Sequence, residues 1–209
     1  MRITIVGTGN MARGIGTRAV AGGNDVTLIE NEPGAAEKLA AELGAVGGGS
    51  ARSGDRVEGD VVVLAVPYAA AGEIVGRLAD ELDGKVVVDI TNPVDFSSFE
   101  PLAVEAGSAA EEIAAAAPEG AKVVKAFNTT FARTLGAGEV AGQPLDVFIA
   151  GDDEDAKRTV ADLAEAGGLR PIDAGPLARA RQLEALGYLH MALQEPLGTG
   201  FTSAVKVLA

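Results

Sequence analysis

A glycine-rich turn near the start of the chain has residue types and spacing that suit phosphate binding. It consists of Gly7, Thr8, Gly9, Asn10, Met11 and Ala12, in the pattern G-x-G-x-x-A. Gly7 would let the chain turn sharply out of a strand, Gly9 would leave room for a pyrophosphate, and Ala12 would let the next helix pack closely. Free N–H groups at the N-terminus of that helix attract phosphate oxygens. Because an apolar run precedes this turn and a helical pattern follows it, we predict a dinucleotide site.

The end of the second predicted strand bears on the choice of dinucleotide. Glu30 lies 21 residues after Gly9. An acid there accepts hydrogen bonds from ribose hydroxyls and repels a 2′-phosphate. Asn31 and Glu32 follow, so this turn offers no basic residue to a 2′-phosphate. The sequence therefore favours NAD over NADP, and the alternative is that Glu30 is an ordinary solvated strand end.

Residues at three further strand ends are candidates for the rest of the site, because ligands of doubly wound sheets bind at the carboxyl ends of strands. These candidates are Val66, Pro67, Tyr68, Asn92, Pro93, Asn128 and Thr129. We expect Tyr68 to pack on the nucleotide and Asn92 to hydrogen-bond to the ribose or the carboxamide. We expect Asn128 and Thr129 to lie over the nicotinamide. The alternatives are a rim aromatic, turn capping and a polar strand end with no role towards substrate.

Short apolar runs that alternate with helical patterns predict the elements that position these residues. Strands are expected at residues 2–7, 25–30, 45–50, 60–67, 85–91, 121–128, 145–151 and 169–173. Helices are expected at residues 10–21, 33–43, 68–82, 109–117, 153–165 and 177–193, and residues 201–208 as a short helix or strand. This order predicts a Rossmann-type α/β fold, with a doubly wound, mostly parallel sheet and helices on both faces.

The pair Gly175-Pro176 is the best candidate for a boundary. We predict a dinucleotide-binding domain over residues 1–175 and a small helical segment over residues 176–209. That segment is too short to fold alone, so it would close the pocket or form a dimer interface.

Composition excludes several classes of function. The 209 residues carry a net charge of −13, no cysteine and a single histidine, His190. Thiolate or histidine-rich metal sites are therefore excluded, and a polyanion such as DNA would be repelled. No apolar run is long enough to span a membrane, and the chain opens on a predicted strand rather than a signal peptide. We expect a cytoplasmic protein that binds neither nucleic acid, nor membrane, nor a metal ion.

The chain resembles the F420-dependent NADP oxidoreductase family, whose wider relatives include the reductase domains of metalloreductases. The resemblance rests on residues 7–11, on Val66-Pro67 and most specifically on residues 151–153 and 168–177. It implies hydride transfer between a nicotinamide and the deazaflavin coenzyme F420, a C-terminal part that closes the pocket, and a homodimer.

Three departures from the pattern of that family are visible, of which Ala12 in place of the third glycine is harmless for binding. Glu30 and Asn31 stand where NADP-using members carry a small polar residue and an arginine. Asn128 stands where the deazaflavin enzymes carry a histidine. These departures leave two alternatives open: a flavin-like acceptor in place of F420, and NAD in place of NADP.

Catalysis would then rest on positioning rather than on proton transfer, and we assign no catalytic acid or base. The pocket candidates are Asn128, Thr129 and His190; a packed helix residue is the alternative for His190. Arg179 and Arg181 would hold the carboxylate-rich tail of a deazaflavin, or form surface ion pairs. Two other functions stay open: an NAD(P)H-dependent reductase of a small imine or carbonyl, and a non-catalytic dinucleotide-binding sensor.

Overall fold

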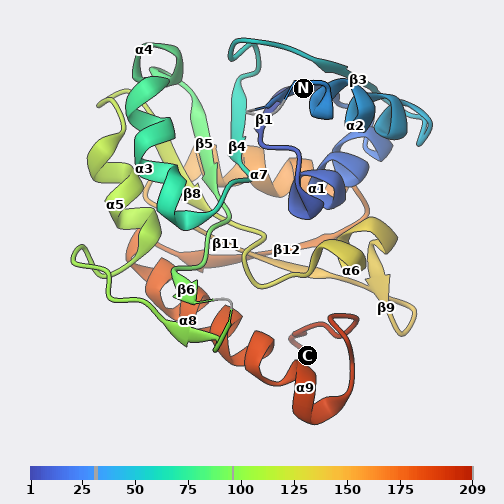
Figure 1. The fold of residues 1–209 in the computed structure, drawn as a ribbon, viewed down its shortest axis with the longest axis vertical. Coiled ribbons are helices and arrows are strands. Elements are labelled where there is room, and N and C mark those ends of the chain that lie inside the picture. The colour runs from blue at the N-terminus through green and yellow to red at the C-terminus, as the bar shows by residue number, and fades with distance from the viewer. Residues whose placement is uncertain (31–32, 96, 209) are drawn as a thin grey trace.

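The apolar runs of the chain assemble into one sheet at the centre of the molecule. The computed structural model describes residues 1–30, 33–95 and 97–208. The sheet has eight strands in the order β12-β11-β8-β5-β4-β1-β2-β3 (Figure 1). Their bounds are β1 Arg2–Val6, β2 Asp25–Ile29, β3 Ser50–Ser53, β4 Val61–Leu64, β5 Val86–Asp89, β8 Lys122–Lys125, β11 Asp146–Gly151 and β12 Arg170–Gly175. Neighbouring strands run parallel except β11 and β8, which confirms the predicted fold class.

Helices cover both faces of this sheet because alternate strand residues point to opposite sides. Ile3 and Ile5 of β1 face one apolar cluster, which includes buried residues of α1 Asn10–Ala21, α2 Ala35–Gly44 and α7 Glu154–Ala166. Val6 faces the other cluster, with α3 Tyr68–Arg77, α4 Ala79–Leu82 and α5 Ala109–Ala116. The carboxyl ends of the central strands lie between these two layers, where a ligand site is expected.

The last part of the chain crosses from the sheet to the outside of the molecule. A 3₁₀ turn at Leu177–Arg179 leads into α8 Ala180–Ala192 and then α9 Gln194–Leu197. Figure 1 draws α8 alongside β11 and β12, with α9 beyond it. Leu177 and Ala180 join the second apolar cluster, and Leu183 packs with Phe148 and Ala150 of β11.

The final residues return to the start of β11, where Asp146 is buried. Its carboxylate binds Arg170 at 2.6 Å and Lys206 at 2.8 Å, and accepts the Val207 N–H at 2.8 Å. Burial alone would raise the pKa of Asp146, but these hydrogen bonds lower it to about 2. The tail is therefore anchored by side-chain contacts rather than by a strand.

Three predicted elements differ from the structure. The strand predicted at residues 45–50 lies at Ser50–Ser53, because Gly47 and Gly48 adopt positive φ and form a turn. The helix predicted at residues 68–82 is broken at Leu78 into α3 and α4. Residues 202–208 form neither a helix nor a strand.

Four short features had no prediction. They are α6 Ala132–Ala137, α9, and two small antiparallel pairs formed by β6 Val94–Asp95 with β7 Glu100–Pro101 and by β9 Glu139–Val140 with β10 Gln143–Pro144. Within the described residues, no helix is long and apolar enough to cross a bilayer. The same residues bring together no group of three or more acidic, histidine or cysteine side chains suited to a metal ion.

Candidate dinucleotide site

A cavity of about 840 Å³ lies at the carboxyl ends of the central strands. It brings together eight of the predicted site residues: Gly9, Asn10, Met11, Val66, Pro67, Tyr68, Asn92 and Asn128. Gly7, Thr8, Glu30, Pro93, Thr129 and His190 are not part of its lining, as far as the described residues define it. Asn31 lies outside the described residues. The strand ends that are far apart in sequence thus meet at one cavity.

The glycine-rich turn has the geometry of a phosphate cradle. Gly7 has φ +115°, and a Cβ there would lie 2.2 Å from the Ala65 carbonyl oxygen, so only glycine fits. A Cβ on Gly9 would meet no atom of the described chain within 4 Å. Gly9 is the N-cap of α1 and has no side chain to bond the free N–H groups of the first turn. These groups and the open space fit a pyrophosphate.

Glu30 lies at a second cavity of about 660 Å³, beside the end of β2. Its carboxylate accepts the N–H of Gly34 at 2.8 Å and also that of Ala36, so it caps the start of α2. Arg77, from the last turn of α3, lines the same cavity. Sequence reasoning missed Arg77 because it considered only cations next to Glu30 in the chain.

Two asparagines join the ends of β5 and β8 to α8. Asn92 donates from Nδ2 to the Asn128 carbonyl at 2.8 Å, and Asn128 donates to Asn92 Oδ1 and to the Leu183 carbonyl, both at 2.9 Å. The Nδ2 and Oδ1 atoms of the Asn92 side chain are therefore both hydrogen-bonded within the protein. Asn128 Oδ1 and the Thr91 hydroxyl are buried and have no partner among the described residues, and both residues line the cavity.

The backbone just before Asn128 is strained. Phe127 is buried and has φ +62°, a conformation that costs a residue other than glycine about 1–3 kcal/mol. The Thr130 side chain and N–H both donate to the Phe127 carbonyl, at 2.7 and 3.1 Å, and hold this bend. The bend orients Asn128 differently from a residue in a regular strand. The sequence contains no pattern that predicts this bend.

His190 serves packing in this structure. Its Nδ1 lies 3.1 Å from the Thr129 carbonyl and its Nε2 lies 2.8 Å from Ser203 Oγ. The ring lies 4.2 Å from that of Phe131, measured between centroids. Burial lowers the pKa of His190, so the neutral ring is favoured and both of its nitrogens bond to the protein.

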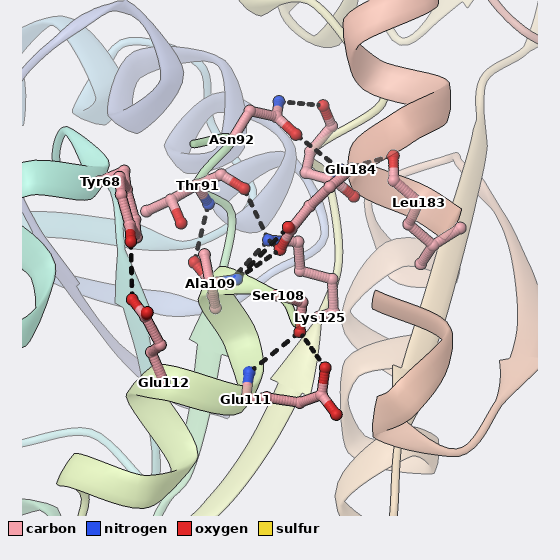
Figure 2. Close-up of polar contacts among 12 residues, drawn as sticks. Tyr68, Thr91, Asn92, Ser108, Ala109, Glu111, Glu112, Lys125, Leu183 and Glu184 are labelled. Atoms are coloured by element: carbon pink, nitrogen blue, oxygen red, sulfur yellow. Dashed lines mark hydrogen bonds and ion pairs between the residues drawn. The ribbon is translucent and has the colours of Figure 1, made fainter. Parts of the chain in front are cut away.

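Tyr68 lines the cavity and hydrogen-bonds to α5. Its hydroxyl donates to Glu112 at 2.7 Å, as Figure 2 shows. Burial, with the carboxylates of Glu112 and Glu184, raises the pKa of Tyr68 to about 12. Burial also raises the pKa of Tyr188. Both phenols therefore stay protonated near neutral pH and are poor acids.

The cations at the cavity are not those that the sequence suggested. Arg13 of α1 and Arg133 of α6 line it. Arg181 instead pairs with Glu111 at 2.7 Å, and Arg179 is not part of the lining that the described residues form. The short helix α6 was not predicted, so its arginine could not be assigned to the site.

Comparison with known proteins gives the family. The family model "NADP oxidoreductase coenzyme F420-dependent" matches residues 2–93. The F420-dependent NADP reductase of Methanothermobacter thermautotrophicus is 32% identical to this chain, over 89% of the chain and 86% of that protein. The chain belongs to the F420-dependent NADP oxidoreductase family. It is an NADP-linked oxidoreductase, and the relatives' names give no support to the predicted preference for NAD.

Two further relatives agree with this family. A solved structure from Arthrobacter sp. FB24, provisionally assigned as an F420-dependent NADP reductase, superposes with a TM-score of 0.81 at 29% identity and covers 99% of both chains. Metalloreductase STEAP3 of Rattus norvegicus is 34% identical over 88% of this chain. The match spans only 36% of that longer protein, so it concerns one part of it.

Proposed function

We propose that this F420-dependent NADP oxidoreductase family member transfers a hydride between NADP(H) and coenzyme F420. The cavity that joins the glycine-rich turn to the end of β8 carries the proposal, because one continuous space serves both a phosphate cradle and polar strand ends. Arg133 at this cavity suits an anionic acceptor such as the carboxylate-rich tail of a deazaflavin, whereas Arg13, which also lines the cavity, already pairs with Glu42. When both are bound, the nicotinamide supplies the hydride and a solvent proton completes the reduction of the deazaflavin.

The residues of the chain would act by binding, orienting and excluding water. The N–H groups at the start of α1 would hold the pyrophosphate, and the Thr91 hydroxyl and Asn128 Oδ1 would bond the nicotinamide end. Apolar neighbours in the lining, such as Ile90 and Met191, would keep water from the rings. The polar groups of Tyr68 and His190 are already hydrogen-bonded within the protein, so we assign no proton donor.

An absorbance assay tests the acceptor. We expect NADPH to reduce oxidised F420, with loss of the visible band of the deazaflavin. Turnover with a flavin but none with F420 would contradict F420 and favour a flavin-like acceptor. Turnover only on an imine or carbonyl panel would favour that reductase, and tight NADPH binding without any turnover would favour a sensor.

We propose that Arg77 binds the 2′-phosphate of NADP(H), since it reaches the cavity at the end of β2 from another helix. The acids at the same cavity are Glu30, Glu37, Asp55 and Glu81. Two of them have roles inside the protein: Glu30 caps α2, and Glu81 accepts the Val57 N–H at 2.7 Å. Arg77 is the one cation in the described lining of this cavity, so its guanidinium is the group best suited to a phosphate.

Replacing Arg77 by alanine tests this role. The NADPH dissociation constant should rise about tenfold, because a charge-assisted contact worth about 1.5 kcal/mol is lost, while the NADH constant stays within about twofold. Arg52→Ala is the matched control, since Arg52 pairs with Glu58 and does not line the cavity within the described chain. Tighter binding of NADH than of NADPH to the wild-type protein would contradict the proposal and favour NAD, as Glu30 alone suggested.

We also propose that the protein is a homodimer and that residues 176–209 take part in its interface. Leu189, Leu193 and Leu197 follow one another at intervals of four and are 57%, 38% and 62% exposed. Leu189 lies in α8, Leu193 at the break that follows it and Leu197 in α9, and such a series of exposed leucines is typical of a contact with another apolar surface. Sedimentation equilibrium should give twice the mass of one chain, and a monomer at micromolar concentration would contradict the proposal.

A further inference from the structure

Three ionised side chains form a buried cluster beneath the cavity. Lys125 Nζ lies 2.8 Å from Asp89 Oδ2 and 2.7 Å from Glu184 Oε1, and the three side chains are 0%, 0% and 3% exposed. Figure 2 labels Lys125 and Glu184 of this cluster. The residues come from β8, β5 and α8. The cluster therefore joins two adjacent strands of the sheet to the C-terminal helix.

Every hydrogen of the Lys125 ammonium has an acceptor. The third acceptor is the Thr91 carbonyl, at 2.6 Å. Glu184 also accepts the N–H of Ala109, at the start of α5, at 3.1 and 3.3 Å. The cluster holds two carboxylates and one ammonium, so the positive end of the α5 dipole compensates part of the remaining charge.

This cluster fixes the strand end that carries Thr91. Asp89 Oδ1 accepts the Thr91 N–H at 2.8 Å while Lys125 binds the Thr91 carbonyl. Both polar groups of the Thr91 backbone are thus held by the cluster. Thr91 and the following residue, Asn92, line the cavity.

The same turn of α8 holds the neighbouring strand end. The carbonyl of Leu183, directly before Glu184, accepts the Asn128 side chain at 2.9 Å. One turn later, a Cβ on Gly187 would lie 2.9 Å from Asn92 Oδ1 and 3.2 Å from the Asn128 carbonyl. Glycine at that position lets α8 approach both strand ends closely.

We propose that Glu184 and Lys125 are positioning residues for the dinucleotide site, which they serve by fixing the ends of β5 and β8 against α8. A buried ion cluster adds little stability over apolar side chains of similar size. Its particular effect here is to hold the strand ends at the wall of the cavity, where Thr91 and Asn128 carry polar groups that are unpaired among the described residues. The inference rests on the proposed function only in requiring that the cavity bind NADP(H).

NADPH fluorescence titrations on three variants test the inference. Glu184→Leu releases Lys125 from α8, and we expect the NADPH dissociation constant to rise about tenfold, with KM rising likewise and kcat within about threefold. Glu184→Gln keeps an acceptor for Lys125, so its constant should stay within about threefold of wild type. The triple variant Asp89→Asn, Lys125→Met, Glu184→Leu removes all three charges, and we expect it to fold and to bind NADPH as weakly as Glu184→Leu.

Asp146→Asn is the matched control. It alters another buried carboxylate with two cationic partners, which does not line the cavity as far as the described residues define it. We expect a lower unfolding midpoint in urea by circular dichroism, with NADPH affinity within about twofold of wild type. This control separates loss of stability from loss of binding.

Affinity within about twofold of wild type in a folded Glu184→Leu or triple variant would overturn the inference. A triple variant that does not fold would overturn it too, because the cluster would then be needed for the fold itself. Absence of NADPH binding by the wild-type protein would instead overturn the proposed function, and the inference with it.

Discussion

Replacing Lys125 by methionine should lower the free energy of unfolding by about 3–5 kcal/mol, because it leaves two buried carboxylates without their cation. Asp89 and Glu184 are 0% and 3% exposed at their side chains, so water cannot take the place of the ammonium. Methionine has a similar length and packs well, so a cavity is not the cause. Urea unfolding followed by circular dichroism measures the loss.

The loss should also depend on pH with a definite sign. Burial already raises the pKa of Glu184 in the wild-type protein, against the opposing effect of Lys125. Without Lys125 the folded-state pKa of Glu184 rises further above its unfolded value of about 4, so the folded state binds more protons than the unfolded state. Stability of the variant should therefore fall as pH rises, and its deficit should be smaller at about pH 5 than at about pH 8.

Lys157→Met is the control for this experiment. Lys157 is as well paired as Lys125, but its partners Glu154 and Asp173 are 75% and 60% exposed. Its loss should cost no more than about 1 kcal/mol. Equal losses in the two variants, or a Lys125→Met deficit that grows at low pH, would contradict the buried-charge explanation.

Replacing Gly7 by alanine should both destabilise the fold and remove dinucleotide binding. The new Cβ would meet the Ala65 carbonyl oxygen at 2.2 Å, on a backbone with φ +115°. Neither atom can move without shifting β1 or the loop after β4, so we expect a loss of about 3 kcal/mol in the free energy of unfolding. Thermal unfolding and NADPH titration measure the two effects.

Gly9→Ala separates these effects, since its Cβ meets no described atom within 4 Å and its φ of −75° suits alanine. We expect stability within about 0.5 kcal/mol of wild type but an NADPH dissociation constant at least about tenfold higher, because the methyl group would occupy the space for the pyrophosphate. Gly72→Ala, on the surface of α3, should leave affinity unchanged. Normal NADPH affinity in Gly9→Ala would contradict a phosphate site at this turn.

The fold was readable from the sequence because local and long-range signals agree in the strands that matter. The run 61–64 is entirely valine and leucine and is buried on both faces, as a central parallel strand requires. The strand at 50–53 was displaced because its residues, Ser-Ala-Arg-Ser, lack an apolar pattern and pair only with β2 at the edge of the sheet. Edge strands depend on backbone pairing more than on side-chain burial, so patterning does not reveal them.

The site was readable only in part. The glycine-rich turn and the strand ends could be named, because parallel strands bring their carboxyl ends to one edge. The sequence could not identify Arg77, Lys125 and Glu184 as site residues. Each acquires its role from a residue at least 36 positions away or from another helix. A lysine in a strand and a glutamate in a helix look like surface residues until the fold buries them together.

The contacts of α8 with both strand ends determine which segments of this protein can be replaced by those of a homologue. A chimera that takes residues 1–175 from one homologue and the remainder from another would separate Lys125 from Glu184, and Asn128 from the backbone that orients it. The chain leaves the sheet after residue 175, but a chimera should not be joined at this position. Recombination within the family should succeed when the sheet and the C-terminal helix are taken from the same homologue.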